Sequence, residues 1–319
     1  MSTIFIGGGT PSLMPVGFYD KLFSCIRENF LILPDAEISI EVNPGTLTAA
    51  KAVEYQRVGI NRISFGLQST EDEELRTIGR IHTYEDFLKS YEVARKAGIN
   101  NINVDIMMGL PGQSVESLKS TLSRVTMLHP EHISAYMLII EEGTPFYDIY
   151  REHPEAFPNE ENVSEMYENT IHFLEKRGYG QYEISNFARK GYECRHNLGY
   201  WKRIPYLGIG LGASSLMNDT RYRVTTDLSE YLKALSYEQE DKLTMKDMKN
   251  ETVMLGLRLK EGISYSDIAA EFGDGYAGYL VTRLKSYVEQ GFMEHDYDRY
   301  FFNEKGFLVS NSILAELME

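Results

Sequence analysis

The sequence is poor in cysteine and has no long hydrophobic run. Its 319 residues include only Cys25 and Cys194, which are too few for a disulfide scaffold and indicate a reducing compartment. No apolar stretch approaches the roughly 20 residues that cross a bilayer, and the first residues show no signal-peptide pattern. We therefore expect a cytoplasmic protein without a transmembrane segment.

Positive charge is also scarce. Lysine and arginine total 32 against 47 aspartates and glutamates, which gives a formal net charge of −15 and a pI near 5.0. Nucleic-acid-binding proteins usually present a basic face, so we expect no nucleic-acid partner. The 43% apolar content is sufficient for a large buried core, which makes a folded globular protein the default expectation.

Short β-branched runs alternate with segments of helical period over the first two thirds of the chain. The expected strands are 3–6, 37–42, 62–67, 101–107, 132–140 and 181–187, and the expected helices are 16–29, 48–58, 84–97, 115–128 and 161–177. This βα repeat predicts an α/β fold with a parallel sheet curved into a partial (β/α) TIM-like barrel, and a flat doubly wound sheet is the alternative.

The pattern changes toward the C-terminus. The glycine-rich run 206–215 is expected to form a last strand associated with the barrel. Helices are then predicted over 245–259, 265–272 and 276–290, followed by a hairpin over 292–302 and a final helix. We therefore expect a barrel domain over residues 1–235 and a small helical, winged-helix-like domain over residues 240–319.

Polar residues gather where the predicted strands end, which is the edge where parallel α/β folds bind ligands. The triglycine turn that includes Gly8 and Gly9 leads to Thr10, and it lets the backbone approach a ligand. It is not a Walker A loop, because no lysine follows it. The other candidates at this edge are Glu41, Gln68, Arg80 and Asp105.

These side chains suit a zwitterionic ligand that carries a ribose. A carboxylate such as Glu41 or Asp105 accepts hydrogen bonds from an ammonium group or from ribose hydroxyls, and Arg80 can pair with an α-carboxylate. Each residue by itself has a structural alternative, such as capping a loop, so the prediction depends on the whole set.

A second cluster of chemical groups occupies residues 194–201. It places His196, Asn197, Tyr200 and Trp201 within six residues. Histidine is a common ligand of heme iron, and large aromatic side chains can stack on a porphyrin. From these residues alone, a hydrogen-bonded structural role for His196 stays open.

Several stretches resemble a known family. They are TIFIGGGTPSLMP, EISIEVNPGT, NRISFGLQS, IGRIHT, NVDIMMGLPGQ, YEISNFARKGYECRHNLGYW and YLGIGLGAS, and they resemble the oxygen-independent coproporphyrinogen III oxidase-like radical S-adenosylmethionine (SAM) proteins. The pattern HNxxYW is similar to the signature of their heme-chaperone, HemW-like branch. The resemblance covers nearly the whole chain.

The resemblance implies cofactors, partners and site residues. It implies SAM contacts at Gly8, Gly9, Thr10, Glu41, Gln68, Arg80 and Asp105, and a heme site at His196, Asn197, Tyr200 and Trp201, with His196 as a possible iron ligand. It also implies a [4Fe–4S] cluster in the full-length family protein, an electron donor for that cluster and a heme-acceptor protein.

The chain departs from the family in one respect. Three thiolates of a CxxxCxxC motif hold the cluster in radical SAM proteins, and no such motif is present. We therefore expect the chain to begin after the first strand and the cluster loop, to be incapable of radical cleavage of SAM, and to self-associate through the strand edge at residues 3–6. Cys25 is expected to be a buried, small apolar residue, and Cys194 is a weaker candidate for heme ligation.

Three functions fit these observations. The first is a heme chaperone that binds SAM and heme and transfers heme to an acceptor. The second is an oxygen-independent coproporphyrinogen III oxidase, which decarboxylates propionate side chains by radical chemistry. The third is a shortened, non-catalytic binding protein.

Overall fold

The computed structural model describes residues 1–234 and 236–318. The chain forms two compact units, Met1–His196 and Asn197–Glu319, and each is described by itself. The expected domain boundary between residues 235 and 240 stays a prediction. Within the described residues, no helix has both the length and the apolar composition needed to cross a bilayer.

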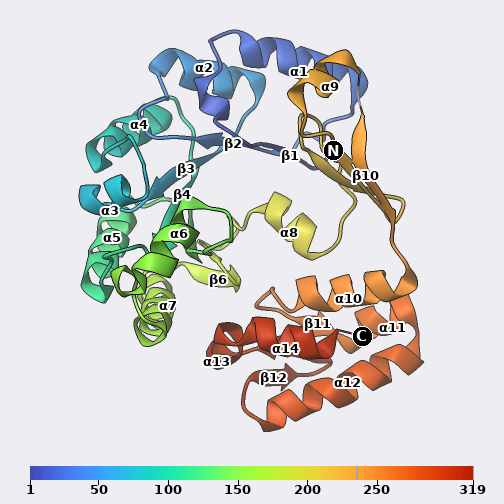
Figure 1. Cartoon of the computed structure of the whole chain (residues 1–319). Helices are drawn as coiled ribbons and strands as arrows, with labels where there is room; N and C mark the ends of the chain where they lie inside the picture. Colours follow the sequence, from blue (N-terminus) through green and yellow to red (C-terminus); the bar gives the residue numbers. More distant parts are fainter. Residues whose placement is uncertain (235, 319) are drawn as a thin grey trace. The chain divides into compact units, whose positions relative to one another are not determined.

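The first unit is built on a curled, seven-stranded half-barrel sheet (Figure 1). Its order is β1 (Thr3–Ile6), β2 (Glu37–Val42), β3 (Arg62–Gln68), β4 (Asn101–Met108), β5 (His132–Met137), β7 (Asn186–Ala188) and β6 (Gly180–Glu183). Neighbouring strands from β1 to β5 are parallel. The predicted partial barrel is therefore confirmed.

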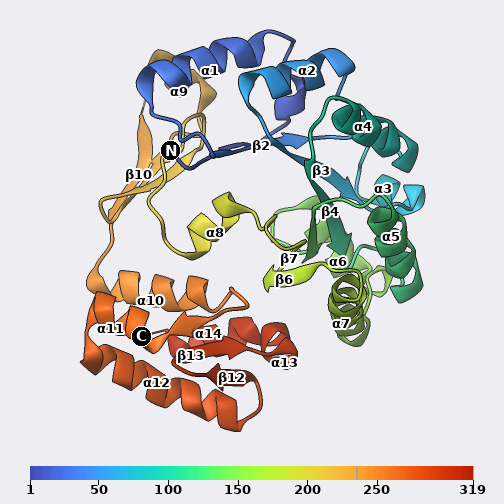
Figure 2. The ribbon, with the colours of Figure 1, turned by 180° about the vertical axis from the view of Figure 1, so that it is seen from behind.

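Helices follow the outer side of this sheet (Figure 2). They are α1 (Phe18–Asn29), α2 (Ala49–Val58), α3 (Asp72–Thr77), α4 (Tyr84–Lys96), α5 (Val115–Met127) and α7 (Glu160–Glu175). A 3-10 turn follows β1 at Pro11–Leu13, and the long connection between β5 and α7 contains α6 (Pro145–Glu152) and a 3-10 turn at Pro154–Ala156. Local chemistry sets their ends: Thr83 and Asp86 form a capping box at the start of α4, and Gly59 ends α2 in the left-handed conformation, with φ of 95°.

The strand expected at 181–187 is wrong in detail. It is a hairpin of β6 and β7, in which only Ile184 and Ser185 separate the two strands. Because parallel strands need a crossover of a dozen or more residues, so short a connection makes β7 antiparallel to β6, and β7 is also antiparallel to β5.

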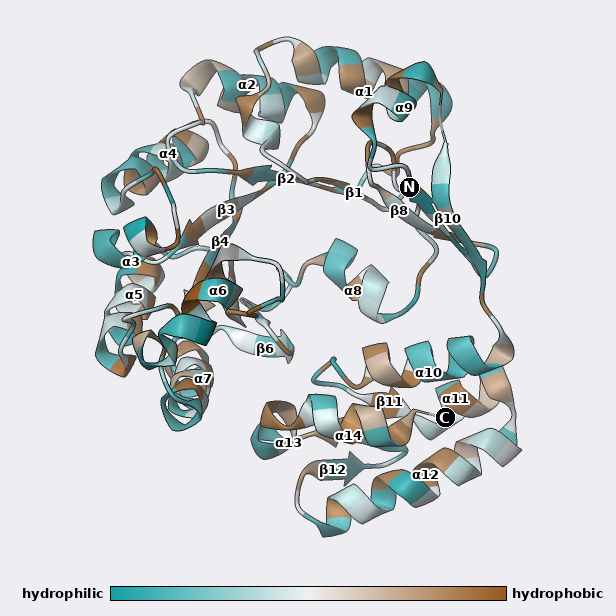
Figure 3. Ribbon diagram, in the orientation of Figure 1, coloured by the Kyte–Doolittle hydropathy of each residue, from teal (hydrophilic) through white to brown (hydrophobic). Residues whose placement is uncertain are grey.

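The two faces of the sheet differ in polarity. Residues that point toward the helices are apolar and buried, as Ile38, Ile40 and Ile63 are. Residues that alternate with them, such as Ser39 and Arg62, are polar and line the concave inner face. Hydrophilic and hydrophobic residues also alternate along the surrounding helices (Figure 3), so the apolar core lies between the sheet and the helices and leaves the inner face for polar groups.

The second unit begins within α8 (Arg195–Trp201) and continues into a three-stranded antiparallel sheet. The sheet consists of β8 (Ser214–Met217), β9 (Thr220–Val224) and β10 (Tyr237–Lys242), with α9 (Leu228–Lys233) between the last two strands. The expectation that 206–215 forms a barrel strand is wrong. Gly210 and Gly212 have φ of 126° and 69° and interrupt the extended backbone, so the strand begins at Ser214 and pairs with β9.

The C-terminal part of the second unit combines helices with a small sheet. It contains α10 (Met245–Gly256), β11 (Ile263–Ser264), α11 (Tyr265–Phe272), α12 (Asp274–Glu289), β12 (Met293–Asp296), β13 (Arg299–Phe302), α13 (Glu304–Leu308) and α14 (Ser310–Leu317). The expected hairpin is present as β12 and β13, whose turn carries Tyr297 with φ of 51°. The strand order β11-β13-β12 with its helices confirms a winged-helix-like module.

Candidate functional site

The triglycine turn after β1 lies against the end of β2. The backbone N–H of Gly8 donates a hydrogen bond to Oε2 of Glu41 at 3.1 Å. A Cβ atom on Gly7 would lie 3.0 Å from Cδ of Glu41, so a larger residue would push this carboxylate away. Gly8 and Gly9 have φ of 84° and 63°, which are values that glycine adopts without strain. The glycines therefore allow the backbone to lie directly over the Glu41 carboxylate.

The loop that follows the glycines is tied to the same end of β2. The side-chain amide of Asn43 donates to Oγ1 of Thr10 at 3.4 Å, and the backbone N–H of Asn43 donates to Oγ of Ser12 at 3.2 Å. Thr10 is half-buried. These contacts place Thr10 at the rim formed by the carboxyl ends of β1 and β2.

Gln68 ends β3 in an unusual conformation. Its φ is 75°, and the register with β4 shifts between Phe65 and Gln68. A positive φ in a residue other than glycine costs of order 1–3 kcal/mol and is concentrated at functional sites. The phenol of Tyr136 donates to Oε1 of Gln68 at 2.8 Å, which holds the amide in place at the rim.

Asp105 lies on β4 and faces the inner side of the sheet. Its Oδ1 accepts a hydrogen bond from Nδ2 of Asn103 at 2.7 Å. Burial raises the pKa of Asp105 from 3.8 to about 6, although hydrogen bonds from Asn103 and Ser134 and the charge of Arg62 oppose the rise. The nearby negative charge of Glu41 adds to it. The two carboxylates therefore interact electrostatically across the rim.

Tyr136 is a residue that the sequence analysis missed. Burial raises its pKa well above the ordinary value, and the charge of Asp105 raises it further, while the positive charge of Arg80 lowers it. Glu41 also raises it slightly. Tyr136 thus lies within electrostatic range of three predicted site residues and hydrogen-bonds the fourth, Gln68. The sequence does contain a signal for this role. Every second residue of β5 faces the inner side of the sheet, and Tyr136 is one of these residues.

A hydrogen-bonded chain leads away from Asp105 toward the other end of the strands. Asn103 contacts Nδ1 of His132 at 2.6 Å, and Nε2 of His132 contacts the phenol of Tyr182 at 2.8 Å. The backbone N–H of Cys194 donates to that phenol at 3.2 Å. Because Oδ1 of Asn103 can only accept, Nδ1 of His132 carries the proton, and the neutral ring accepts at Nε2 from the phenol of Tyr182. Burial and the charge of Arg62 keep the pKa of His132 well below its ordinary value, and the sequence analysis gave this residue no role.

The structure places His196 at the amino ends of β1 and β2. The carboxylate of Glu37 accepts hydrogen bonds from the backbone N–H groups of Arg195, at 2.9 Å, and His196, at 3.1 Å. The Nδ1 atom of His196 lies 3.0 Å from Oγ1 of Thr3, and its ring stacks on Phe5 with centroids 5.1 Å apart. Burial lowers the pKa of His196.

His196 is therefore not brought together with the rim residues. Glu37, which holds it, and Glu41 at the rim lie four residues apart on β2, which corresponds to about 13 Å along a strand. The remaining members of the predicted heme site, Asn197, Tyr200 and Trp201, belong to the second unit. There the ring of Tyr200 packs edge-on against Tyr206, with centroids 4.7 Å apart.

The two cysteines lie in different surroundings. Cys194 is buried, and its thiol donates to Oε1 of Glu37 at 3.4 Å. Cys25 is exposed, so the expectation that it is buried is wrong. On α1 the buried side chains are those of Tyr19 and Phe23, and Cys25 lies about 200° around the helix from Phe23. Two cysteines cannot supply the three thiolates of a [4Fe–4S] cluster, and the described part of the chain holds no cluster of potential metal ligands.

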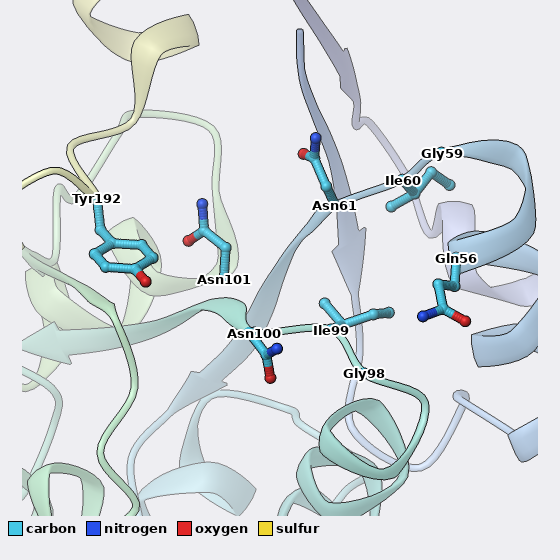
Figure 4. A pocket seen from close by; sticks show the side chains of 9 residues that line it. All are labelled: Gln56, Gly59, Ile60, Asn61, Gly98, Ile99, Asn100, Asn101 and Tyr192. Carbon is cyan, nitrogen blue, oxygen red and sulfur yellow. The ribbon is translucent and has the colours of Figure 1, made fainter. Parts of the chain in front are cut away.

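A pocket of about 340 Å³ is found at the amino ends of β3 and β4, away from the rim (Figure 4). Its lining residues include Asn61 and Asn101 from the strand starts and Tyr192 from the loop before α8. The side-chain amide of Asn61 is used structurally, because it bonds the backbone of Ile38 and Ala36. This pocket holds none of the residues predicted to bind SAM.

Comparisons with known proteins identify relatives of this chain. The model of the radical SAM superfamily matches residues 1–125, and that of the HemN C-terminal domain matches residues 243–309. The chain is 35% identical to the heme chaperone HemW of Bacillus subtilis, where the alignment covers 100% of this chain and 86% of the relative. The chain belongs to the HemW family of radical SAM proteins. It is also 34% identical to HemW of Escherichia coli, over 98% of this chain and 83% of that protein.

Solved structures extend the comparison to the fold. The coproporphyrinogen III oxidase HemN from Escherichia coli, a radical SAM enzyme, superposes with a TM-score of 0.83 at 25% identity, over 99% of this chain and 77% of that one. Membership of the radical SAM superfamily implies SAM and a [4Fe–4S] cluster as the family's cofactors. The donor set at the rim fits SAM chemically, whereas the cysteines of this chain do not fit the cluster.

Proposed function

We propose that this chain is a heme chaperone of the HemW family that binds SAM at the rim of its half-barrel and transfers heme to an acceptor protein in the cytoplasm. The family relationship over the full length supports this proposal. The observation that carries the SAM part is the convergence of Glu41, Gln68, Arg80 and Asp105 around Tyr136.

The rim residues divide the recognition of SAM between them. Arg80 pairs with the ligand's carboxylate, because its guanidinium offers parallel N–H donors. Glu41 and Asp105 accept hydrogen bonds from the ammonium group and the ribose hydroxyls. Gly8, Gly9 and Thr10 supply a backbone that approaches the ligand closely, and Gln68 offers an amide held by Tyr136.

The cluster enters this account only as a property of the family. When bound, a [4Fe–4S] cluster supplies the electron that cleaves SAM, and it needs an electron donor of its own. Cys25 and Cys194 do not provide its three ligands, so no radical step is derived for this chain.

The heme part rests on the HNxxYW segment. His196 is the candidate iron ligand, and its Nδ1 atom contacts Oγ1 of Thr3, which orients the ring. Asn197, Tyr200 and Trp201 complete the segment, with an amide for hydrogen bonding and two aromatic rings for stacking on a porphyrin. Glu37 fixes the start of α8.

Titration of the purified protein with hemin tests the heme part. We expect a Soret band that saturates at one heme per chain and that weakens in His196→Ala. The control is His153→Ala, because His153 is exposed and far along the chain from the HNxxYW segment. Failure of the wild-type protein to bind hemin, or equal binding by His196→Ala, would contradict the proposal.

Calorimetric titration with SAM tests the rim. We expect Tyr136→Phe to weaken SAM binding about five- to tenfold, because the lost hydrogen bond to Gln68 contributes about 1 kcal/mol. The control is Tyr150→Phe, a half-exposed tyrosine on α6. Unchanged affinity in Tyr136→Phe would show that the rim is not the SAM site.

The similarity to HemN favours a second candidate, oxygen-independent coproporphyrinogen III oxidase. The two functions differ in the preferred tetrapyrrole. Competition between hemin and metal-free coproporphyrin III separates them, because a chaperone needs the iron and an oxidase needs the four propionates. Tighter binding of coproporphyrin III would favour the oxidase.

A further inference from the structure

Arg62 is a buried charge without a partner. It is the first residue of β3, its side chain is 2% exposed, and its Nε atom is buried without a hydrogen bond. Among residues 1–234 and 236–318, no carboxylate forms an ion pair with it and no acceptor receives a hydrogen bond from its guanidinium. Burying an unpaired charge costs several kcal/mol, so the fold retains this guanidinium at a considerable loss of stability.

The strand neighbours of Arg62 also carry buried polar atoms that lack hydrogen bonds. Arg62 is paired in register with Ser39 on β2 and with Asn101 on β4, so the three side chains lie side by side on the inner face of the sheet. Oγ of Ser39 and Oδ1 of Asn101 are buried and also lack partners. The oxygen and nitrogen of an amide are assigned from the hydrogen-bond network, and either can face the same group. Ser39 and Arg62 therefore offer two unsatisfied donors side by side, and the unsatisfied atom of Asn101 is the acceptor Oδ1, whose place Nδ2 takes when the amide is turned over.

The charged groups around Arg62 do not neutralise it. Glu37 precedes Ser39 by two residues on β2, but both of its oxygens accept hydrogen bonds from the start of α8. Asp105 has a raised pKa, and its Oδ1 is bonded to Asn103. Among the groups whose pKa is shifted, His132, Tyr182 and His196 also sense the charge of Arg62, and none of these three is an anion at neutral pH. An anion from outside the chain would complete this environment.

We propose that Ser39, Arg62 and Asn101 form a carboxylate-binding subsite on the inner face of the half-barrel. We identify its occupant as a propionate of heme, and this identification rests on the proposed function. A carboxylate fits this row because it accepts from the fork of a guanidinium and from a hydroxyl at the same time. The rim residues already provide Arg80 for the carboxylate of SAM, so Arg62 at the opposite end of β3 is left for a second acidic ligand.

The subsite lies next to a cavity that solvent can enter. The pocket of about 340 Å³ is lined by Asn101 and by Asn61, which precedes Arg62 in the chain (Figure 4). This volume lies at the lower end of the range of about 300–1,000 Å³ for small-molecule pockets. It has room for a small carboxylate or for the acidic arm of a larger molecule.

The first experiment measures the subsite without heme. Thermal unfolding of the ligand-free protein is followed in sodium propionate and in sodium chloride at equal ionic strength. We expect propionate to raise the Tm of the wild-type protein but not that of Arg62→Met, whose apolar side chain has a similar length. Arg57→Met is the control, because Arg57 is exposed and pairs with Asp20 on the surface of α2, and it should keep the propionate effect.

The second experiment identifies the source of the carboxylate. The affinities of hemin and of hemin dimethyl ester, in which both propionates are blocked, are compared in the wild type, Arg62→Met and Arg62→Lys. We expect the wild type to bind hemin about 10- to 100-fold more tightly than the ester, as a charge-assisted pair would produce. Arg62→Met should lose this preference, and Arg62→Lys should retain part of it.

The results separate the two proposals. If propionate does not raise the Tm of the wild type, or raises the Tm of Arg62→Met equally, the carboxylate subsite is overturned. If the wild type binds no hemin, the heme function fails, while the propionate experiment still decides the subsite. A preference for hemin over its ester that survives in Arg62→Met overturns the assignment to a heme propionate. Replacing a buried unpaired charge with methionine should not lower the Tm of the ligand-free protein, so loss of folding is not expected to obscure these outcomes.

Discussion

The substitution Asp105→Asn tests the electrostatics of the inner face through stability. Asp105 has a pKa of about 6 in the folded protein against 3.8 for its unperturbed value. Between these two values the folded state binds more protons than the unfolded state, so the free energy of unfolding falls as pH rises through this window. At pH 7 the ionised carboxylate is held in a site that favours its neutral form.

The size of the effect follows from the same two values. A difference of about 2 pKa units corresponds to roughly 3 kcal/mol at about 1.36 kcal/mol per unit. Asparagine is similar in shape, cannot ionise and still offers Oδ1 to Asn103. We therefore expect Asp105→Asn to be more stable than the wild type by up to about 3 kcal/mol at pH 7, and to differ little near pH 4.

Denaturant unfolding of both proteins at half-unit steps between pH 4 and pH 7.5 measures this difference. Because all other titrating groups are shared, the difference between the two curves reports Asp105 alone. SAM binding should weaken in the variant, because its amide replaces an acceptor with a donor. A difference in stability that is constant over this range, or a wild type that becomes more stable relative to the variant as pH rises, would refute the reasoning.

Three further predictions follow from individual contacts. Gln68→Gly should change the free energy of unfolding by less than about 1 kcal/mol, because relief of the strained φ of 75° offsets the lost hydrogen bond from Tyr136. Calorimetry should show weaker SAM binding, and a loss of stability well above about 1 kcal/mol would contradict the reasoning. Glu37→Gln should lower the free energy of unfolding by about 1–3 kcal/mol, because it weakens the charge-assisted bonds to the start of α8. The exposed Glu142→Gln is the control, and hemin titration is a second measurement. Titration with a thiol reagent should label one cysteine rapidly in the native protein, since Cys25 is exposed and Cys194 is buried, and two in denaturant; two rapid labels would contradict the burial of Cys194.

Much of the fold could be predicted from periodicity, because the helices and parallel strands of the first unit are long and have clear stop signals. The helix predicted from residue 84 begins at Tyr84 because Thr83 caps it. The two strand errors had a common cause. The propensity of residues 181–187 and 206–215 for extended structure does not reveal how they pair. The short turn at Ile184 and Ser185 decided the pairing of the first segment, and glycines with positive φ interrupted the second.

Part of the candidate site could also be predicted from the order of strands and helices in the sequence. Glu41, Gln68 and Asp105 could be placed at one edge because parallel strands end at the same side of a sheet. Tyr136, Asn103 and His132 were missed, since their role depends on which face of each strand is turned inward and on contacts across strands. Cys25 was assigned to the core because its helix is amphipathic, but the choice of face depends on packing against the sheet.

The sequence by itself determined the family, the βα order and the identity of the polar groups at the strand ends, because these follow from residue types and their spacing. Only the tertiary structure decided that His196 is held at the opposite end of the strands from the rim. It also decided that Arg62 is buried beside Ser39 and Asn101 without a partner. Whether a charge is neutralised depends on every side chain that packs around it, and those neighbours come from strands that are far apart in the chain.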